Sequence, residues 1–150
     1  MKKMYFLSVI LFCGLIVGAI YASGATITYF LNIASFLMVA GISFSLLLGS
    51  YTPKEMARYF SVAFTGEERT DNELKKAYNF FEAIQQYMLL SGFIGTMIGA
   101  ITMLVLLEDT SKVGFGAALA LMTLLYGLLI ILLIALPFKN GIKKMLTDRE

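Results

Sequence analysis

The sequence predicts an all-α integral membrane protein with four transmembrane helices. Its composition, 59% hydrophobic and 15% charged residues, is far from that of a soluble domain. Four stretches without a charged residue are each long enough to cross a hydrocarbon core of roughly 30 Å as a helix. Helices are favoured over an open sheet because backbone polar groups in lipid must be paired internally. We expect the spans at about 4–22, 27–49, 87–107 and 113–137.

The basic residues predict the orientation of these spans. Eleven of the twelve precede the first span, lie between the second and third, or follow the fourth, and only Lys112 remains for the other side. Basic residues concentrate in cytoplasmic loops, so both termini are expected in the cytoplasm. The cytoplasmic regions are then the segment 51–86 and a short tail, 138–150.

The first span, 4–22, has an alternative interpretation as a cleaved signal peptide, because two lysines precede it and small residues follow it. Cleavage would leave three spans. A lipoprotein site at Cys13 is disfavoured by the bulky Phe12 before it, and Cys13 fits better as a small packing residue. The second span, 27–49, follows after a very short outer turn, so the first two spans are expected to form an antiparallel hairpin.

The cytoplasmic segment is predicted to be helical. After Pro53, aromatic and apolar residues recur at helical spacing, which predicts a short amphipathic helix whose aromatic side contacts lipid headgroups or the bundle. A turn is expected at 66–69, and Thr70 with Glu73 forms a capping-box pattern that starts the third helix. That helix continues to about residue 107 without a proline. Its length of roughly 55 Å requires it to extend into the cytoplasm.

Small residues line one face of the third span and one of the fourth. On a helical wheel, the third span brings together Gly92, Gly95, Thr96 and Gly99, and the fourth has Gly116, Ala120, Thr123 and Gly127 spaced by four, three and four. One interpretation is helix packing, with each threonine bonded to its own helix. The other is a narrow pore in which the two hydroxyls supply polarity. The spacing leaves both open.

The spans contain none of the residue types that usually carry ions through membranes. All four lack Asp, Glu, Lys, Arg and His. If the protein conducts ions, another chain must therefore supply the carboxylate. The sequence has no histidine, a single cysteine and no glycine-rich phosphate loop after a strand, so we expect neither an enzyme nor a metal site nor a cofactor.

The third and fourth spans resemble those of the MotA/TolQ/ExbB proton-channel family, the ion-driven motor subunits of bacterial inner membranes. The resemblance is carried by GFIGTMIGAITML at 92–104 and by VGFGAALALMTLLYG at 113–127 with ALP at 135–137. Residues 30–64 resemble the flagellar-stator branch. Four spans with the main cytoplasmic segment after the second also match the MotA branch.

The resemblance implies a homopentamer in the inner membrane, whose third and fourth helices surround two copies of a single-span partner similar to MotB, TolR or ExbD that bears an intramembrane aspartate. Thr96 and Thr123 would line the ion route, while Tyr126 and Pro137 would shape the fourth helix, which also extends beyond the membrane. The residues that would pack around the partner are Gly92, Gly95, Gly99, Gly116, Ala120 and Gly127.

Three departures refine this expectation. Phe115 stands where the family often has proline, which puts the geometry of helix entry in question. Leu124 replaces a second threonine and removes a hydroxyl that sodium would use, so protons are favoured over sodium as the transported ion. The small segment 51–86 argues against flagellar rotation. The alternative function is a four-helix membrane scaffold or assembly protein that transports nothing.

Overall fold

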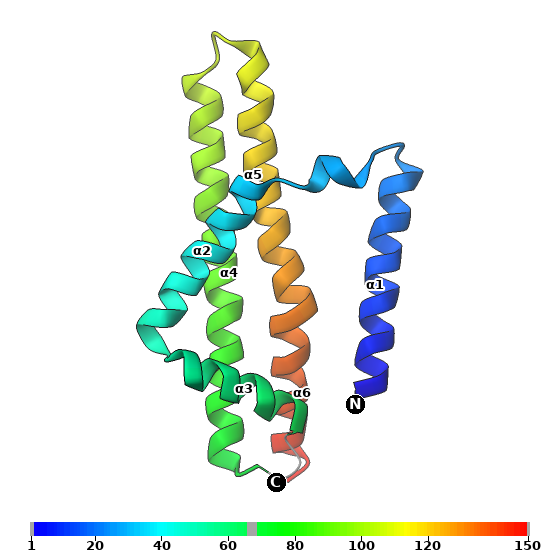
Figure 1. Cartoon of the computed structure of the whole chain (residues 1–150), viewed down its shortest axis with the longest axis vertical. Helices are drawn as coiled ribbons and strands as arrows, with labels where there is room; N and C mark the ends of the chain where they lie inside the picture. Colours follow the sequence, from blue (N-terminus) through cyan, green and yellow to red (C-terminus); the bar gives the residue numbers. More distant parts are fainter. Residues whose placement is uncertain (1, 66–68, 150) are drawn as a thin grey trace. The chain divides into compact units, whose positions relative to one another are not determined.

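The computed structural model describes residues 2–65 and 69–149, and most of them are helical (Figure 1). The prediction of an all-α protein is confirmed. Four helical stretches are long and apolar enough to cross a membrane, as predicted: Tyr5–Ala22, Ile27–Ser50, Asp71–Val105 and Lys112–Thr147. In chain order the elements are α1 (Lys2–Ala22), η1 (Ile27–Phe30), α2 (Ile33–Ser50), α3 (Pro53–Thr65), α4 (Asp71–Val105), α5 (Thr110–Ile130), η3 (Ile131–Ala135) and α6 (Leu136–Thr147).

The chain divides into two units, residues 1–33 and 34–150. In the first unit, α1 is followed by Gly24 with φ 74°, a backbone conformation that glycine adopts without steric cost. The 3-10 helix η1 comes next, so the predicted second span starts with a short turn before α2. Asn32 stands immediately before α2, where short polar residues are favoured as caps. The hairpin expected from the first two spans stays a prediction.

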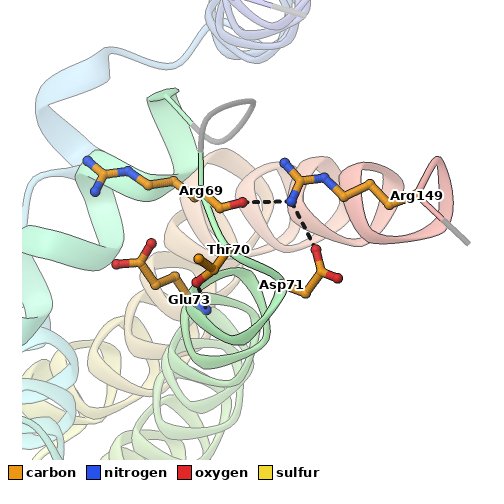
Figure 2. A network of polar contacts seen from close by, with 5 residues as sticks. All are labelled: Arg69, Thr70, Asp71, Glu73 and Arg149. Carbon is orange, nitrogen blue, oxygen red and sulfur yellow. Dashed lines mark hydrogen bonds and ion pairs between the residues drawn. The ribbon is translucent and has the colours of Figure 1, made fainter.

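The longest element, α4, is one continuous helix of 35 residues. Its start is the predicted one, because the side-chain oxygen of Thr70 accepts a hydrogen bond from the backbone N–H of Glu73 at 3.4 Å (Figure 2). The turn expected at 66–69 falls mainly on residues 66–68, which lie outside the described residues. Arg149, just after α6, donates to the backbone oxygen of Arg69 and to the carboxylate of Asp71, at 2.6 and 2.9 Å.

The helix α3 is amphipathic, as predicted, and its aromatic side packs on α4 and α6. Ring centroids of Phe60 and Phe81 lie 5.3 Å apart, and those of Phe64 and Phe138 lie 5.0 Å apart. We call the following residues the aromatic cluster: Tyr51, Tyr59, Phe60, Phe64, Phe80, Phe81 and Phe138. Burying one such ring contributes about 1.5–3 kcal/mol, so this cluster is a main source of stability where α3, α4 and α6 meet.

The fourth span runs through α5, η3 and α6 and lies beside α4 (Figure 1). It begins at Thr110, so Phe115 lies inside the helix and helix entry occurs before it. Near the other end, η3 is a π-helical turn in which the N–H of Leu136 donates to the carbonyl of Ile131. Pro137 follows directly and has no N–H to donate to the carbonyl four residues earlier, which explains why the regular hydrogen-bond ladder changes here.

Candidate functional site

The predicted glycine stripes face each other within one chain and bring α4 and α5 into close contact. A methyl group placed on Gly99 would lie 2.5 Å from the backbone nitrogen of Ala120, and one on Gly116 would lie 2.8 Å from that of Met103. Carbon atoms do not approach other atoms that closely. We call this contact the α4–α5 seam. Only glycine permits the observed helix separation at these two positions.

The seam continues toward the cytoplasmic side in the predicted topology. A methyl group on Gly95 would lie 2.5 Å from Cγ2 of Thr123, and one on Gly127 would lie 2.8 Å from the carbonyl oxygen of Met88. The six small residues expected to pack around a partner therefore take part in packing within the chain: Gly92, Gly95, Gly99, Gly116, Ala120 and Gly127. Their contact with a partner helix stays a prediction.

The two threonine hydroxyls converge on one backbone carbonyl in the seam. Thr96 Oγ1 lies 3.0 Å from the carbonyl oxygen of Ala120 on the neighbouring helix and 2.9 Å from that of Gly92 on its own. Thr123 Oγ1 lies 3.0 Å from the same Ala120 oxygen and 3.1 Å from that of Leu119. The oxygens of both threonines and of Ala120 thus form a compact polar group in an apolar region. The sequence indicated the two hydroxyls but not this shared carbonyl.

The two threonines differ in accessibility. The side chain of Thr123 is fully buried between its own helix and Gly95, whereas Thr96 is only partly buried. Each hydroxyl donates its proton to a carbonyl and keeps oxygen lone pairs as acceptors. The packing interpretation accounts for the hydrogen bonds to the own helix. The bond from Thr96 across the seam adds a connection between the two helices that this interpretation did not require.

Sequence analysis missed a second polar contact, between α2 and α4. Ser43 donates to the hydroxyl of Ser91 at 2.9 Å, and both side chains are fully buried. Nearer the end of α2, the hydroxyls of Ser50 and Tyr87 lie 3.4 Å apart. The available signal was a pair of serines, Ser35 and Ser43, eight residues or about two turns apart on the buried stripe of α2. Hydrogen bonds of this kind between membrane helices contribute about 0.6 kcal/mol on average, so they orient α2 more than they stabilise it.

Tyr126 and Pro137, the residues expected to shape the fourth helix, lie in α5 and α6 respectively. Tyr126 packs edge to face on Phe36 of α2, with ring centroids 6.1 Å apart. Pro137 is the second residue of α6 and lies two residues after the π turn. Among the described residues, the structure contains no group of three or more His, Cys, Asp or Glu side chains that could hold a metal ion. The candidate site is the polar group in the seam, because two hydroxyls from neighbouring helices meet one carbonyl there.

The fold and this site define a helical membrane protein whose third and fourth spans form a glycine-packed pair with paired hydroxyls. The sequence profile of the MotA/TolQ/ExbB proton channel family matches residues 32–150, which include the whole of this pair. The chain belongs to that family. The predicted family membership is thereby confirmed.

A curated relative agrees with the family match. Motility protein A of Aquifex aeolicus (strain VF5) is 38% identical over 74 residues, which is 49% of this chain and 29% of that protein. The chain thus matches less than a third of the length of this relative.

Proposed function

We propose that the protein is the channel-forming subunit of a motor complex driven by the proton motive force. In this proposal both termini are cytoplasmic, and the third and fourth helices extend beyond the inner membrane. Five copies surround two copies of a single-span partner whose intramembrane aspartate carries the ion. The family membership supports the channel class, while the partner and the driven process go beyond it.

The polar group formed by Thr96, Thr123 and the carbonyl of Ala120 is the observation that carries this proposal. It places three oxygens in the third and fourth spans, which in the predicted ranges 87–107 and 113–137 have no Asp, Glu, Lys, Arg or His of their own. A proton carrier must therefore come from another chain, and a carboxylic acid is the residue type that usually serves. Hydroxyls beside such an acid can exchange hydrogen bonds with it as it gains and loses a proton.

The two threonines have distinct roles in this proposal. Thr123 is buried and fixes the carbonyl of Ala120, whereas the partly exposed Thr96 is the group that meets the partner's aspartate. Because Leu124 supplies no further hydroxyl, the set of oxygen ligands is small for a sodium ion. The transported ion is then the proton.

The proposal is tested by ion flux in vesicles that contain the protein and a single-span partner encoded beside it. Thr96→Val and Thr123→Val keep the side-chain shape and remove the hydroxyl, and each should abolish flux driven by a membrane potential while leaving assembly intact. Thr102→Val is the matched control, because the Thr102 hydroxyl bonds only to the carbonyl of Ile98 on its own helix. Unchanged flux in both seam variants would refute the proposed site.

The α4–α5 seam also supports the alternative function, a membrane scaffold. Close glycine packing and the hydrogen bonds from each threonine to a carbonyl of its own helix can serve helix packing in a protein that transports no ion. The scaffold function predicts a protein that works without a membrane potential and without an aspartate-bearing partner. Replacing the partner's aspartate by asparagine separates the two functions. Loss of activity supports the channel, and full activity supports the scaffold.

A further inference from the structure

Lys139 is held in an enclosed position at the start of α6. Its ammonium nitrogen lies 3.2 Å from a carboxylate oxygen of Glu82, 3.0 Å from the side-chain oxygen of Gln85, and 5.4 Å from the ring centre of Tyr78. All three partners are on α4, at spacings that place them on one helix face. One lysine of α6 is therefore surrounded by one face of α4.

The cation of this ion pair is more enclosed than the cations of the other pairs that the described residues form, while its partner Glu82 is 40% exposed. The side chain of Lys139 is 16% exposed, whereas the cations of the pairs at Arg149, Arg58 and Lys112 are 31%, 60% and 61% exposed. Exposed pairs contribute little because water and salt screen them. An ammonium group with two oxygens and a ring around it holds its helix in one position more firmly than those pairs do.

The location of Lys139 gives the contact a specific consequence. It lies two residues after Pro137 and four residues after the end of the π turn Ile131–Ala135, where the backbone hydrogen bonding of the fourth span is irregular. Irregular turns of this kind are where helices bend. The contact therefore fixes α6 against α4 after the π turn, while the glycine seam fixes α5 against α4 before it.

We infer that Lys139, with Glu82 and Gln85, is a positioning clamp that holds the fourth span in register with α4 across the π turn and thereby aligns Thr123 with Thr96. The part of the inference that concerns ion transport rests on the proposed function, because the alignment of Thr96 with Thr123 affects transport only if the two threonines line the ion route. Lys139 touches no transported ion and acts through the helix. The clamp itself is a property of α4 and α6 alone.

Distances between spin labels test the clamp without any activity. Labels at Asn79→Cys and Lys143→Cys, both exposed, report on α4 and α6 in a Cys13→Ser background. We expect Lys139→Met to broaden the distance distribution and the charge exchange Glu82→Lys with Lys139→Glu to narrow it again. Lys144→Met, which removes an exposed lysine of the same helix, is the matched control and should change nothing. A distribution in Lys139→Met equal to that of the control would overturn the inference.

Flux measurements in the unlabelled variants test the link to transport. The ion flux of Lys139→Met should be at least about tenfold lower than that of the wild type. Lys139→Arg should retain most of the wild-type flux, and the charge exchange should restore it, because an arginine or a reversed ion pair can still join α6 to α4. A broadened distance distribution with wild-type flux would also overturn the inference. If the wild-type complex conducts no ions, the proposed function fails, and the label distances still decide whether the clamp exists.

Discussion

Replacing Gly99 by alanine should separate α4 from α5 and destabilise the protein. The added methyl group would lie 2.5 Å from the backbone nitrogen of Ala120, roughly 1 Å closer than a favourable contact with carbon. Backbone cannot move aside as a flexible side chain can, so the helices must part by a similar distance. Overpacking costs about 1–3 kcal/mol, and alanine regains about 1 kcal/mol over glycine in helix propensity. A net loss of about 1 kcal/mol, and at most about 2 kcal/mol, is therefore expected.

Equilibrium unfolding in mixed detergent and SDS micelles measures this loss. Gly41→Ala is the matched control, because a methyl group at that position of α2 meets nothing within 4 Å. The control should be neutral or stabilised by up to about 1 kcal/mol. If Gly99→Ala is as stable as Gly41→Ala, close backbone packing does not set the helix separation, and the description of the seam is wrong.

A double-mutant cycle distinguishes the two kinds of close contact in the seam. The nearest atoms to a methyl group on Gly95 all belong to the side chain of Thr123, so Thr123→Gly should relieve Gly95→Ala. At Gly99 the nearest atom is backbone nitrogen, so Ala120→Gly should not relieve Gly99→Ala. We expect a coupling energy of about 1 kcal/mol or more for the first pair and a smaller one for the second. Equal couplings would contradict the assignment of the contacts.

Three further predictions concern other parts of the chain. Phe81→Ala should lower the free energy of unfolding by about 3–5 kcal/mol, because Phe81 is fully buried in the aromatic cluster; a loss below that of an exposed Phe93→Ala would contradict this. Ser43→Ala should cost about 0.6 kcal/mol and loosen α2, as measured by cysteine accessibility on α2. The backbone N–H of Thr52 holds the pKa of Glu55 below its ordinary 4.5, so Glu55→Gln should destabilise at neutral pH. The stability difference between the wild type and Glu55→Gln should be present above pH 4.5. It should vanish as the pH falls through the lowered pKa of Glu55 in the folded state, because the wild-type carboxylate is then protonated. A difference in melting temperature that does not change with pH would refute this prediction.

The helices were predictable from the sequence because their signals are local. Uncharged runs, the Thr70 cap and the amphipathic pattern after Pro53 each act within a few residues, and each corresponds to an element of the structure. Pro137 predicted an altered helix but not the π turn that precedes it. A proline indicates that the regular hydrogen bonds of a helix are interrupted, but it does not specify how they rearrange. Helix length was thus easier to predict than helix shape.

The candidate site was only half predictable. The spacing placed Thr96 and Thr123 on small-residue faces, but it did not say that those faces meet within one chain or that both hydroxyls share the carbonyl of Ala120. A backbone oxygen carries no sequence signal, because every residue has one. The contact between Ser43 and Ser91 was missed because it depends on how two helices cross, which the spacing of serines along one helix does not specify.

The contact of Arg149 with Asp71 and the Arg69 carbonyl has a mechanical consequence for the third and fourth spans (Figure 2). The two rods are joined at one end by the short connection 106–109 and at the other by this contact. A contact at this end limits how far α6 can slide along α4 beyond the α4–α5 seam. The last residues described after α6 are thereby tied to the first turn of α4, so the beginning of the third span and the end of the fourth stay next to each other.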